Sequence, residues 1–192
     1  MDEPIPKRRL FIALRFPETT RQTLVKAEDA VVAFAGKARP MLPQNLHLTL
    51  AFLGMQDEQG YNRACEVLKA TAAQCHTVKS TLGEPGVFPC HHQLIVWEGL
   101  EKNENLEHLQ SHLTEELIQR GFVLEQRPFV PHITLARSVR LKKDQSVEEL
   151  KQRISAVLKP DQSTHTHLYL MLSHRVDNVL TYTPLVSEPL LD

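Results

Sequence analysis

Along this 192-residue chain some segments show the apolar spacing of strands and others that of helices, and proline and glycine residues mark where segments begin or end. An apolar run at 9–16 predicts a strand, because its residues are β-compatible and too few for a long helix. Pro17 then suits a helix start, and apolar residues recur every three or four positions until Gly36 stops them. A strand over 45–53 and a helix over 58–75 follow. The first half therefore predicts strand, helix, strand, helix.

The second half repeats this order after a broken or bulged strand over 78–88. Its predicted elements are a strand at 92–100, a helix ending at Gly121, a strand at 132–138 and a helix from about Ser146 to Pro160. Ser146 and Glu149 have the spacing of a capping box. Two closing strands, within 166–172 and 179–185, flank an Arg-Val-Asp-Asn turn.

The strand between the two helices of each half contains nearly the same word, His-Leu-Thr-Leu-Ala in one and His-Ile-Thr-Leu-Ala in the other. Three residues recur at an offset of 85 positions: His47 and His132, Thr49 and Thr134, and Ala51 and Ala136. Matching words in matching element orders predict an internal duplication. We therefore expect an α+β fold, bilobal and duplicated, with two mainly antiparallel sheets flanked by helices and a pseudo-twofold axis through a central cleft. The length favours a single domain over 1–192 made of two lobes.

Alternate residues of a strand point to opposite faces, so each word predicts one polar and one apolar face. The polar faces would carry His47, Thr49 and Ala51 in one strand, and His132, Thr134 and Ala136 in the other. The apolar faces would carry Leu48, Leu50 and Phe52, and Ile133 and Leu135. The small alanines would leave room beside the histidines.

A third His-x-Thr, at His112 and Thr114, lies within a predicted helix. Residues two apart on a helix diverge by about 200°, so we interpret this match as chance. The other histidines are expected to be structural or solvated. Among them, His165 and His167 are predicted to share an exposed strand face.

Composition narrows the class of protein. A net charge of −1 gives no overall positive electrostatic potential for binding long nucleic acid, so a nucleic-acid ligand would be bound through local contacts. Three cysteines without a Cys-x-x-Cys pair exclude an even disulfide framework and favour a reducing compartment. The first apolar run is too short for a signal peptide or a membrane helix. We expect a cytoplasmic protein with no membrane partner.

Two imidazoles and two hydroxyls suit phosphodiester chemistry. One histidine can activate the attacking oxygen, and the other can protonate the leaving oxygen near neutral pH. The threonines can donate hydrogen bonds to the phosphate oxygens. The sequence contains no P-loop and no His-Glu-x-x-His motif, and the scheme needs no metal and no cofactor. The alternative for either motif alone is a satisfied core histidine beside a strand threonine.

The paired words in "NLHLTLAFLG" and "PHITLAR", with the opening "RLFIAL" and the closing "YTPL", resemble the 2H phosphoesterases, in particular the RNA 2′,3′-cyclic phosphodiesterase (2′-5′ RNA ligase) family. The resemblance implies metal-independent hydrolysis of a terminal 2′,3′-cyclic phosphate to a 2′-phosphate, with possible reverse 2′-5′ ligation. It implies His47 as proton donor, His132 as proton acceptor, and Thr49 and Thr134 on the phosphate. The expected partner is RNA or an oligonucleotide with a cyclic phosphate end, and no obligate protein partner is evident.

Two further residues are candidates for substrate binding, Arg137 and Tyr182. Arg137 faces away from His132 in a regular strand but could curl around the strand end towards a phosphate, and the alternative is a solvated basic loop. Tyr182 follows a turn that lacks the glycine common in related proteins. Two other functions stay open. The chain could bind RNA ends or nucleotides without turnover, or it could cleave another cyclic or 2′-linked nucleotide.

Overall fold

The computed structural model describes residues 7–192 and contains two antiparallel sheets, as the duplicated pattern predicts. The first sheet has the order β3-β1-β8-β9 and consists of β1 (Arg8–Arg15), β3 (His47–Gln56), β8 (His167–Val176) and β9 (Val179–Pro189). The second has the order β2-β6-β5-β4-β7 and consists of β2 (Lys37–Pro40), β4 (Val78–Cys90), β5 (Gln93–Leu100), β6 (His132–Arg140) and β7 (Gln162–His165). All strand pairs within the two sheets are antiparallel.

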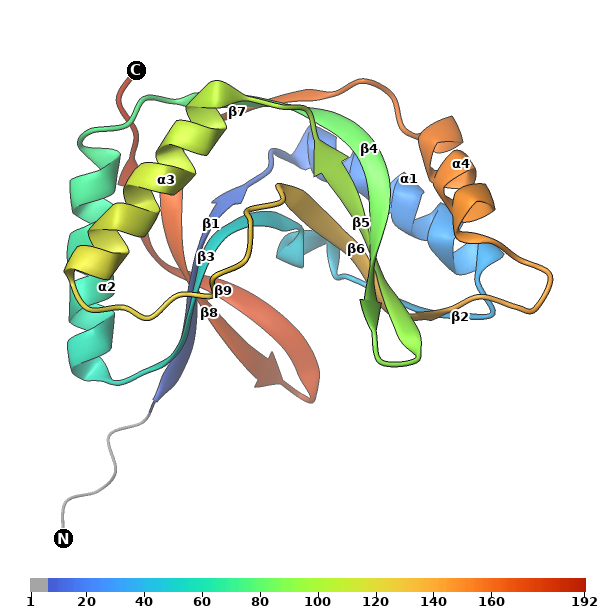
Figure 1. Cartoon of the computed structure of the whole chain (residues 1–192), viewed down its shortest axis with the longest axis horizontal. Coiled ribbons are helices and arrows are strands. Elements are labelled where there is room, and N and C mark those ends of the chain that lie inside the picture. Colours follow the sequence, from blue (N-terminus) through green and yellow to red (C-terminus); the bar gives the residue numbers. More distant parts are fainter. Residues whose placement is uncertain (1–6) are drawn as a thin grey trace, which may run out of the picture.

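Four helices cover the outer sides of the two sheets (Figure 1). They are α1 (Glu18–Phe34), α2 (Glu58–Ala72), α3 (Glu104–Gln119) and α4 (Val147–Val157). Helices α2 and α3 pack together beside the first sheet, and α1 and α4 pack together beside the second. The sheets therefore face each other across the middle of the molecule, and each sheet has its own helix pair, made of one helix from each half of the sequence.

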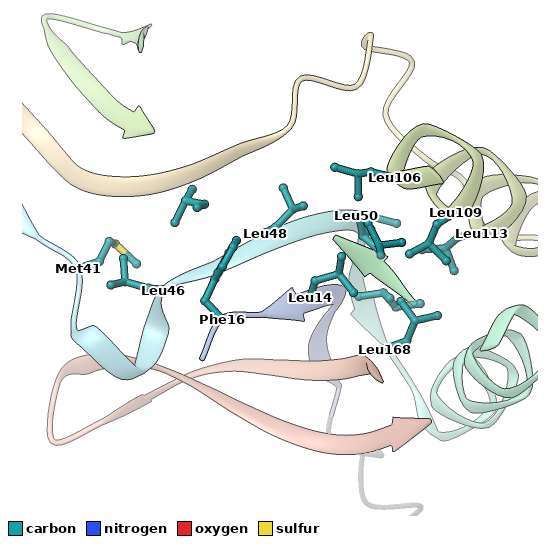
Figure 2. Packing of buried hydrophobic residues seen from close by; sticks show 14 of the residues in the cluster. Leu14, Phe16, Met41, Leu46, Leu48, Leu50, Leu106, Leu109, Leu113 and Leu168 are labelled. Atoms are coloured by element: carbon teal, nitrogen blue, oxygen red, sulfur yellow. The ribbon is translucent and has the colours of Figure 1, made fainter. Parts of the chain in front are cut away.

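One continuous apolar core runs through both halves. Figure 2 shows Leu50 of β3 against Leu106, Leu109 and Leu113 of α3. Burying one such leucine removes it from water at a gain of roughly 1.5–3 kcal/mol. The inner residues of the two motif strands are thus fixed in the core, and this fixes which residues point outward.

Polar side chains cap the predicted helix starts. The Asp57 carboxylate accepts a hydrogen bond from Gly60 N at the start of α2, and Asn103 does the same for Leu106 N at the start of α3. The Ser146 hydroxyl accepts from Glu149 N at 3.1 Å, which confirms half of the capping box. The Glu149 carboxylate pairs with Arg153, one turn further along the helix, and not with the backbone of Ser146.

Two short strands, β2 and β7, were not predicted, because their sequences Lys-Ala-Arg-Pro and Gln-Ser-Thr-His lack apolar alternation. Both lie at sheet edges. The prediction that His165 and His167 share an exposed strand face is wrong. His165 ends β7 in one sheet and is 2% exposed, whereas His167 starts β8 in the other. The chain changes sheet between them, and strand alternation does not continue across that change.

The closing hairpin turns without glycine. Asp177 and Asn178 have φ values of 48° and 64°, and they lie between the paired residues Val176 and Val179. Two central residues with positive φ match the right-handed twist of a two-residue hairpin, and Asp and Asn tolerate that conformation better than most residues.

Glu98 of β5 provides a test of stability. It is fully buried, and neither carboxylate oxygen has a hydrogen-bond partner among residues 7–192. Burial, with a smaller contribution from Glu84, raises its pKa to about 8. Between the unfolded value of 4.5 and 8 the native state therefore holds one proton more than the unfolded state, and stability falls as pH rises through this window.

We expect Glu98→Gln to remove this dependence, because an amide of the same shape cannot ionise. The free energy of unfolding of the wild type should fall relative to the variant from about pH 5 to pH 8, by up to ~1.4 kcal/mol per pH unit. Urea unfolding at a series of pH values measures the difference. A constant difference between the two proteins across this range contradicts the prediction.

Candidate active site

The two motif strands come from different sheets and lie against each other in the middle of the molecule, where Figure 1 draws β3 in teal and β6 in gold. His47 is the first residue of β3, and His132 is the first residue of β6. Both side chains are partly exposed, while the residues that follow them, Leu48 and Ile133, are fully buried. The duplicated sequence therefore presents both imidazoles from equivalent positions.

The ring of His47 is held at both nitrogens. Its Nδ1 lies 2.5 Å from the carbonyl oxygen of Asn45, and its Nε2 lies 2.9 Å from the Thr49 hydroxyl. A carbonyl can only accept, so Nδ1 carries the proton and donates it. In the neutral ring Nε2 then accepts from Thr49. The predicted His47–Thr49 pair on one strand face is confirmed.

His132 makes the same backbone contact at Nδ1. Its Nδ1 donates to the carbonyl oxygen of Val130 at 2.7 Å, which leaves Nε2 as the free nitrogen. Asn45 and Val130 are themselves 85 residues apart. Both halves therefore fix the same tautomer by the same backbone contact, and each histidine keeps Nε2 available for proton transfer.

Aromatic rings surround both imidazoles. Phe11 and Tyr182 lie 4.9 and 5.0 Å from the ring of His47, the tyrosine edge-on. Phe88 and Trp97 lie 5.0 and 5.9 Å from the ring of His132. These rings exclude water from the histidines, which makes a charged imidazole costly. They also bring Tyr182 against His47, and its role in substrate binding stays a prediction.

The electrostatics follow from this packing. Burial is the main cause that lowers the pKa of His47 to about 4, and the hydrogen bond to Asn45 opposes it. Positive charge from Arg137, His132 and Arg15 lowers it further. Burial also lowers the pKa of His132, again with a contribution from Arg137. At neutral pH the free site therefore holds two uncharged imidazoles near the guanidinium groups of Arg137 and Arg15.

A β-bulge in each motif strand corrects the predicted faces. Opposite β1, the consecutive residues Ile12 and Ala13 pair with Ala51 and Thr49, so Leu50 is an extra residue. Opposite β5, Val96 and Trp97 pair with Ala136 and Thr134, so Leu135 is the extra residue. The two bulges are also 85 positions apart.

Each bulge shifts the alternation by one residue, so the face predictions beyond it are wrong. Ala51 and Ala136 are buried, at 9% and 0% exposure, and do not lie beside the histidines. Phe52, predicted to face the core, is 52% exposed, and its ring lies 6.0 Å from Phe11. The extra residue likewise returns Arg137 to the face of His132.

Arg137 is therefore directed to the site by the strand itself and does not need to curl around its end. Its charge acts on both histidines, and its Nε is buried without a hydrogen-bond partner among the described residues. A buried guanidinium nitrogen without a partner is costly, and an anion between the two strands would satisfy it. This geometry disfavours the alternative of a solvated basic loop for Arg137.

Sequence reasoning missed several residues of the site, namely Asn45, Phe52, Phe88 and Trp97. One of them had a usable signal. Phe52 stands 85 positions before Arg137, so the same duplication that paired the histidines also pairs these two. The others approach the histidines from separate strands and turns, and nothing in their local sequence indicates this.

His112 lies on helix α3 and not on a strand, as predicted. Among residues 7–192 no group of three or more His, Cys, Asp or Glu side chains is placed to hold a metal ion. No helix in the same range is both long and apolar enough to cross a membrane.

Known proteins resemble this chain in sequence and in fold. The model of the 2′-5′ RNA ligase superfamily matches residues 16–177. An RNA 2′,3′-cyclic phosphodiesterase of Methanocaldococcus jannaschii is 30% identical over 167 residues, which cover 84% of this chain and 90% of the relative. One of Escherichia coli is 32% identical over 139 residues, 71% and 74% of the two chains.

Solved structures show the same architecture. The crystal structure of E. coli LigT complexed with 3′-AMP has a TM-score of 0.78 at 24% identity, over 97% of this chain and 99% of that one. TT0787 of Thermus thermophilus has a TM-score of 0.76 at 25% identity, over 95% and 97%. With the family model spanning most of the sequence, the chain belongs to the 2′-5′ RNA ligase superfamily.

Proposed function

We propose that this protein hydrolyses the 2′,3′-cyclic phosphate at the end of an RNA or oligonucleotide to a 2′-phosphate, without a metal. The observation that carries the proposal is the matched pair of imidazoles. His47 and His132 come from two sheets, each holds Nδ1–H on a backbone carbonyl, and each keeps Nε2 for proton transfer. Several relatives in the same superfamily bear the name RNA 2′,3′-cyclic phosphodiesterase.

The reaction is an in-line displacement at phosphorus. Nε2 of His132 takes a proton from water as the water oxygen attacks the phosphorus. The bond from phosphorus to the 3′-oxygen breaks, and Nε2–H of His47 protonates that oxygen. The 2′-ester bond stays intact, which leaves a 2′-phosphate and a 3′-hydroxyl.

His47 must carry a second proton to act as the acid, although its pKa in the free site is about 4. The bound substrate can raise this pKa, because the phosphate is an anion and an opposite charge within a few ångströms raises the pKa of an imidazole. Substrate binding therefore prepares the acid, and the Arg137 charge that lowers both pKa values is offset by the same anion. With a 5′-hydroxyl in place of water as the attacking group, the same displacement would open the cyclic phosphate and give 2′-5′ ligation without a nucleotide triphosphate.

The hydroxyls of Thr49 and Thr134 are proposed to hold the phosphate oxygens. In the free site the Thr49 hydroxyl donates to Nε2 of His47 at 2.9 Å, so it already lies where the acid must meet the leaving oxygen. When that nitrogen is protonated it no longer accepts, and the hydroxyl can turn to the phosphate. Phe52, exposed on the same face, offers a ring on which a base can stack.

We expect Thr49→Val and Thr134→Val each to lower kcat by about 10- to 100-fold, less than the loss of a full oxyanion donor because water can replace part of the bond. Valine keeps the branched shape and removes only the hydroxyl. Steady-state kinetics on a cyclic-phosphate oligonucleotide measure the effect. If both variants keep wild-type kcat and KM, the hydroxyls are structural and their proposed role is wrong.

The function is tested by a product assay on RNA ending in a 2′,3′-cyclic phosphate, with 2′- and 3′-phosphate products separated. We expect conversion to the 2′-phosphate alone, at the same rate with and without EDTA. Tight binding without conversion would instead support an RNA-end-binding module. Turnover only of another cyclic or 2′-linked nucleotide would support the other open function. Activity lost to EDTA and restored by a divalent ion contradicts the metal-independent scheme.

A further inference from the structure

We propose that Asn45 is a positioning residue for His47, which ties the start of strand β3 to strand β9 and so fixes the imidazole. This inference rests on the proposed function of His47 as the proton donor. It adds a residue that touches no substrate and acts only through the orientation and the tautomer of the histidine.

Both polar atoms of the Asn45 side chain form hydrogen bonds with the backbone of one distant strand. Asn45 is 2% exposed and ends the short 3₁₀ helix Pro43–Asn45. Its Nδ2 donates to the carbonyl oxygen of Leu180 at 2.8 Å, and its Oδ1 accepts from Tyr182 N at 3.0 Å. Both partners belong to β9, which lies at the opposite edge of the sheet from β3. Asn45 thus joins the two edge strands of a curled sheet.

The backbone of the same residue holds the histidine. The Asn45 carbonyl accepts the Nδ1 proton of His47 at 2.5 Å, and the Tyr182 ring meets the imidazole edge-on at 5.0 Å. The amide that anchors Asn45 therefore also anchors both contacts of the ring, the carbonyl on one side and Tyr182 on the other. Freeing this side chain would leave the carbonyl and the tyrosine without a fixed distance between them.

The other half of the molecule has no such tie. Val130 occupies the equivalent position before His132, is 42% exposed and has no polar side-chain atom. Its carbonyl makes the matching bond to His132, but nothing in its side chain anchors that carbonyl. The two histidines are therefore alike in backbone geometry and different in support, with only His47 braced by a buried amide.

The hydrogen bond from His47 to the Asn45 carbonyl shifts the pKa of His47 in a known direction. The bond from Nδ1 to the carbonyl favours the protonated ring and raises the pKa of His47 against the effect of burial. The groups whose positive charge acts on the ring are Arg15 on β1, Arg137 on β6 and, when it is protonated, His132 on β6, and an Asn45 variant changes none of them. A loosened carbonyl should therefore lower the pKa of the acid, and activity should be lost at lower pH on the alkaline side.

The test compares Asn45→Ala with Asn103→Ala. Asn103 is a matched control, because its amide also makes two backbone hydrogen bonds, from Leu106 N and to the Lys79 carbonyl, at the start of α3 away from the site. We expect Asn45→Ala to lower kcat by up to about 100-fold, the scale of a misplaced catalytic group, with little change in KM. Its alkaline limb should move down by about one pH unit, the equivalent of one ordinary hydrogen bond. Asn103→Ala should change neither.

A second measurement needs no substrate. ¹⁵N NMR of the imidazole should show the Nδ1–H tautomer of His47 in the wild type and a mixture of tautomers in Asn45→Ala, while His132 stays unchanged. If Asn45→Ala does not fold, Asn45→Ser should show the same changes to a smaller degree. A His47 that keeps its tautomer, or a kcat loss shared by Asn103→Ala with no movement of the pH limb, overturns the inference. If the wild type lacks phosphodiesterase activity, the proposed function is wrong. The tautomer measurement then decides the inference about Asn45 by itself.

Discussion

His47→Ala and His132→Ala should each lower kcat by about 10²- to 10⁴-fold, the range for losing a general acid or base. Each imidazole presents Nε2 from a separate sheet with Nδ1 tied to a backbone carbonyl, so neither can take over the role of the other. Because the two act as a unit, the double variant should be about as slow as either single variant. Single-turnover kinetics on a cyclic-phosphate oligonucleotide measure these rates.

The pH profiles separate the two roles. Activity should rise on the acid side as His132 loses its proton and fall on the alkaline side as His47 loses its own, so each variant should lose one limb. His112→Ala is the control, since it removes the histidine of the third His-x-Thr, which lies on α3. Near-wild-type turnover in either active-site variant would falsify the paired-histidine mechanism. Loss of the opposite limbs would reverse the assignment of donor and acceptor.

Arg137→Met should lower kcat/KM by about 10²- to 10³-fold, because methionine keeps much of the length and removes the charge that we propose faces the phosphate. The buried, unpartnered Nε and the action of Arg137 on both histidines indicate that the guanidinium is held in the site. Since its charge lowers both histidine pKa values, its removal should raise them, and both limbs of the pH profile should move to higher pH.

Arg140→Met is the matched control. Arg140 ends the same strand and is exposed, so its loss should change kcat/KM only slightly and mainly at low salt. Equal effects of the two variants would mean that Arg137 contributes only to a general basic surface. An unchanged pH profile in Arg137→Met would mean that its charge does not reach the histidines.

The duplication, and with it most of the fold and half of the site, could be predicted from the sequence alone. Strand and helix periods are local, and the apolar positions that create them also form the core. Of the 14 elements of the described residues, 11 could therefore be predicted, and the strands β2 and β7 and the 3₁₀ helix Pro43–Asn45 were missed. The alternation of a regular strand is enough to predict that His47 and Thr49 share a face, because no irregularity lies between them. The family resemblance carried by the two words agrees with the superfamily that the whole chain matches.

Tertiary structure decided what lies beyond each bulge. An extra residue in a strand arises from how the strand pairs with its neighbour, so the sequence of β3 or β6 alone gave no sign that Leu50 and Leu135 would reverse the faces of Phe52 and Arg137. The same holds for Asn45, whose amide meets a strand 135 residues later only because the sheet curls. The pKa of His47 is likewise a property of packing, since burial by residues from several strands is its main cause. The order of the elements and the paired His-x-Thr motifs can be predicted from local sequence. The faces, partners and charge states of these residues depend on how distant strands pair.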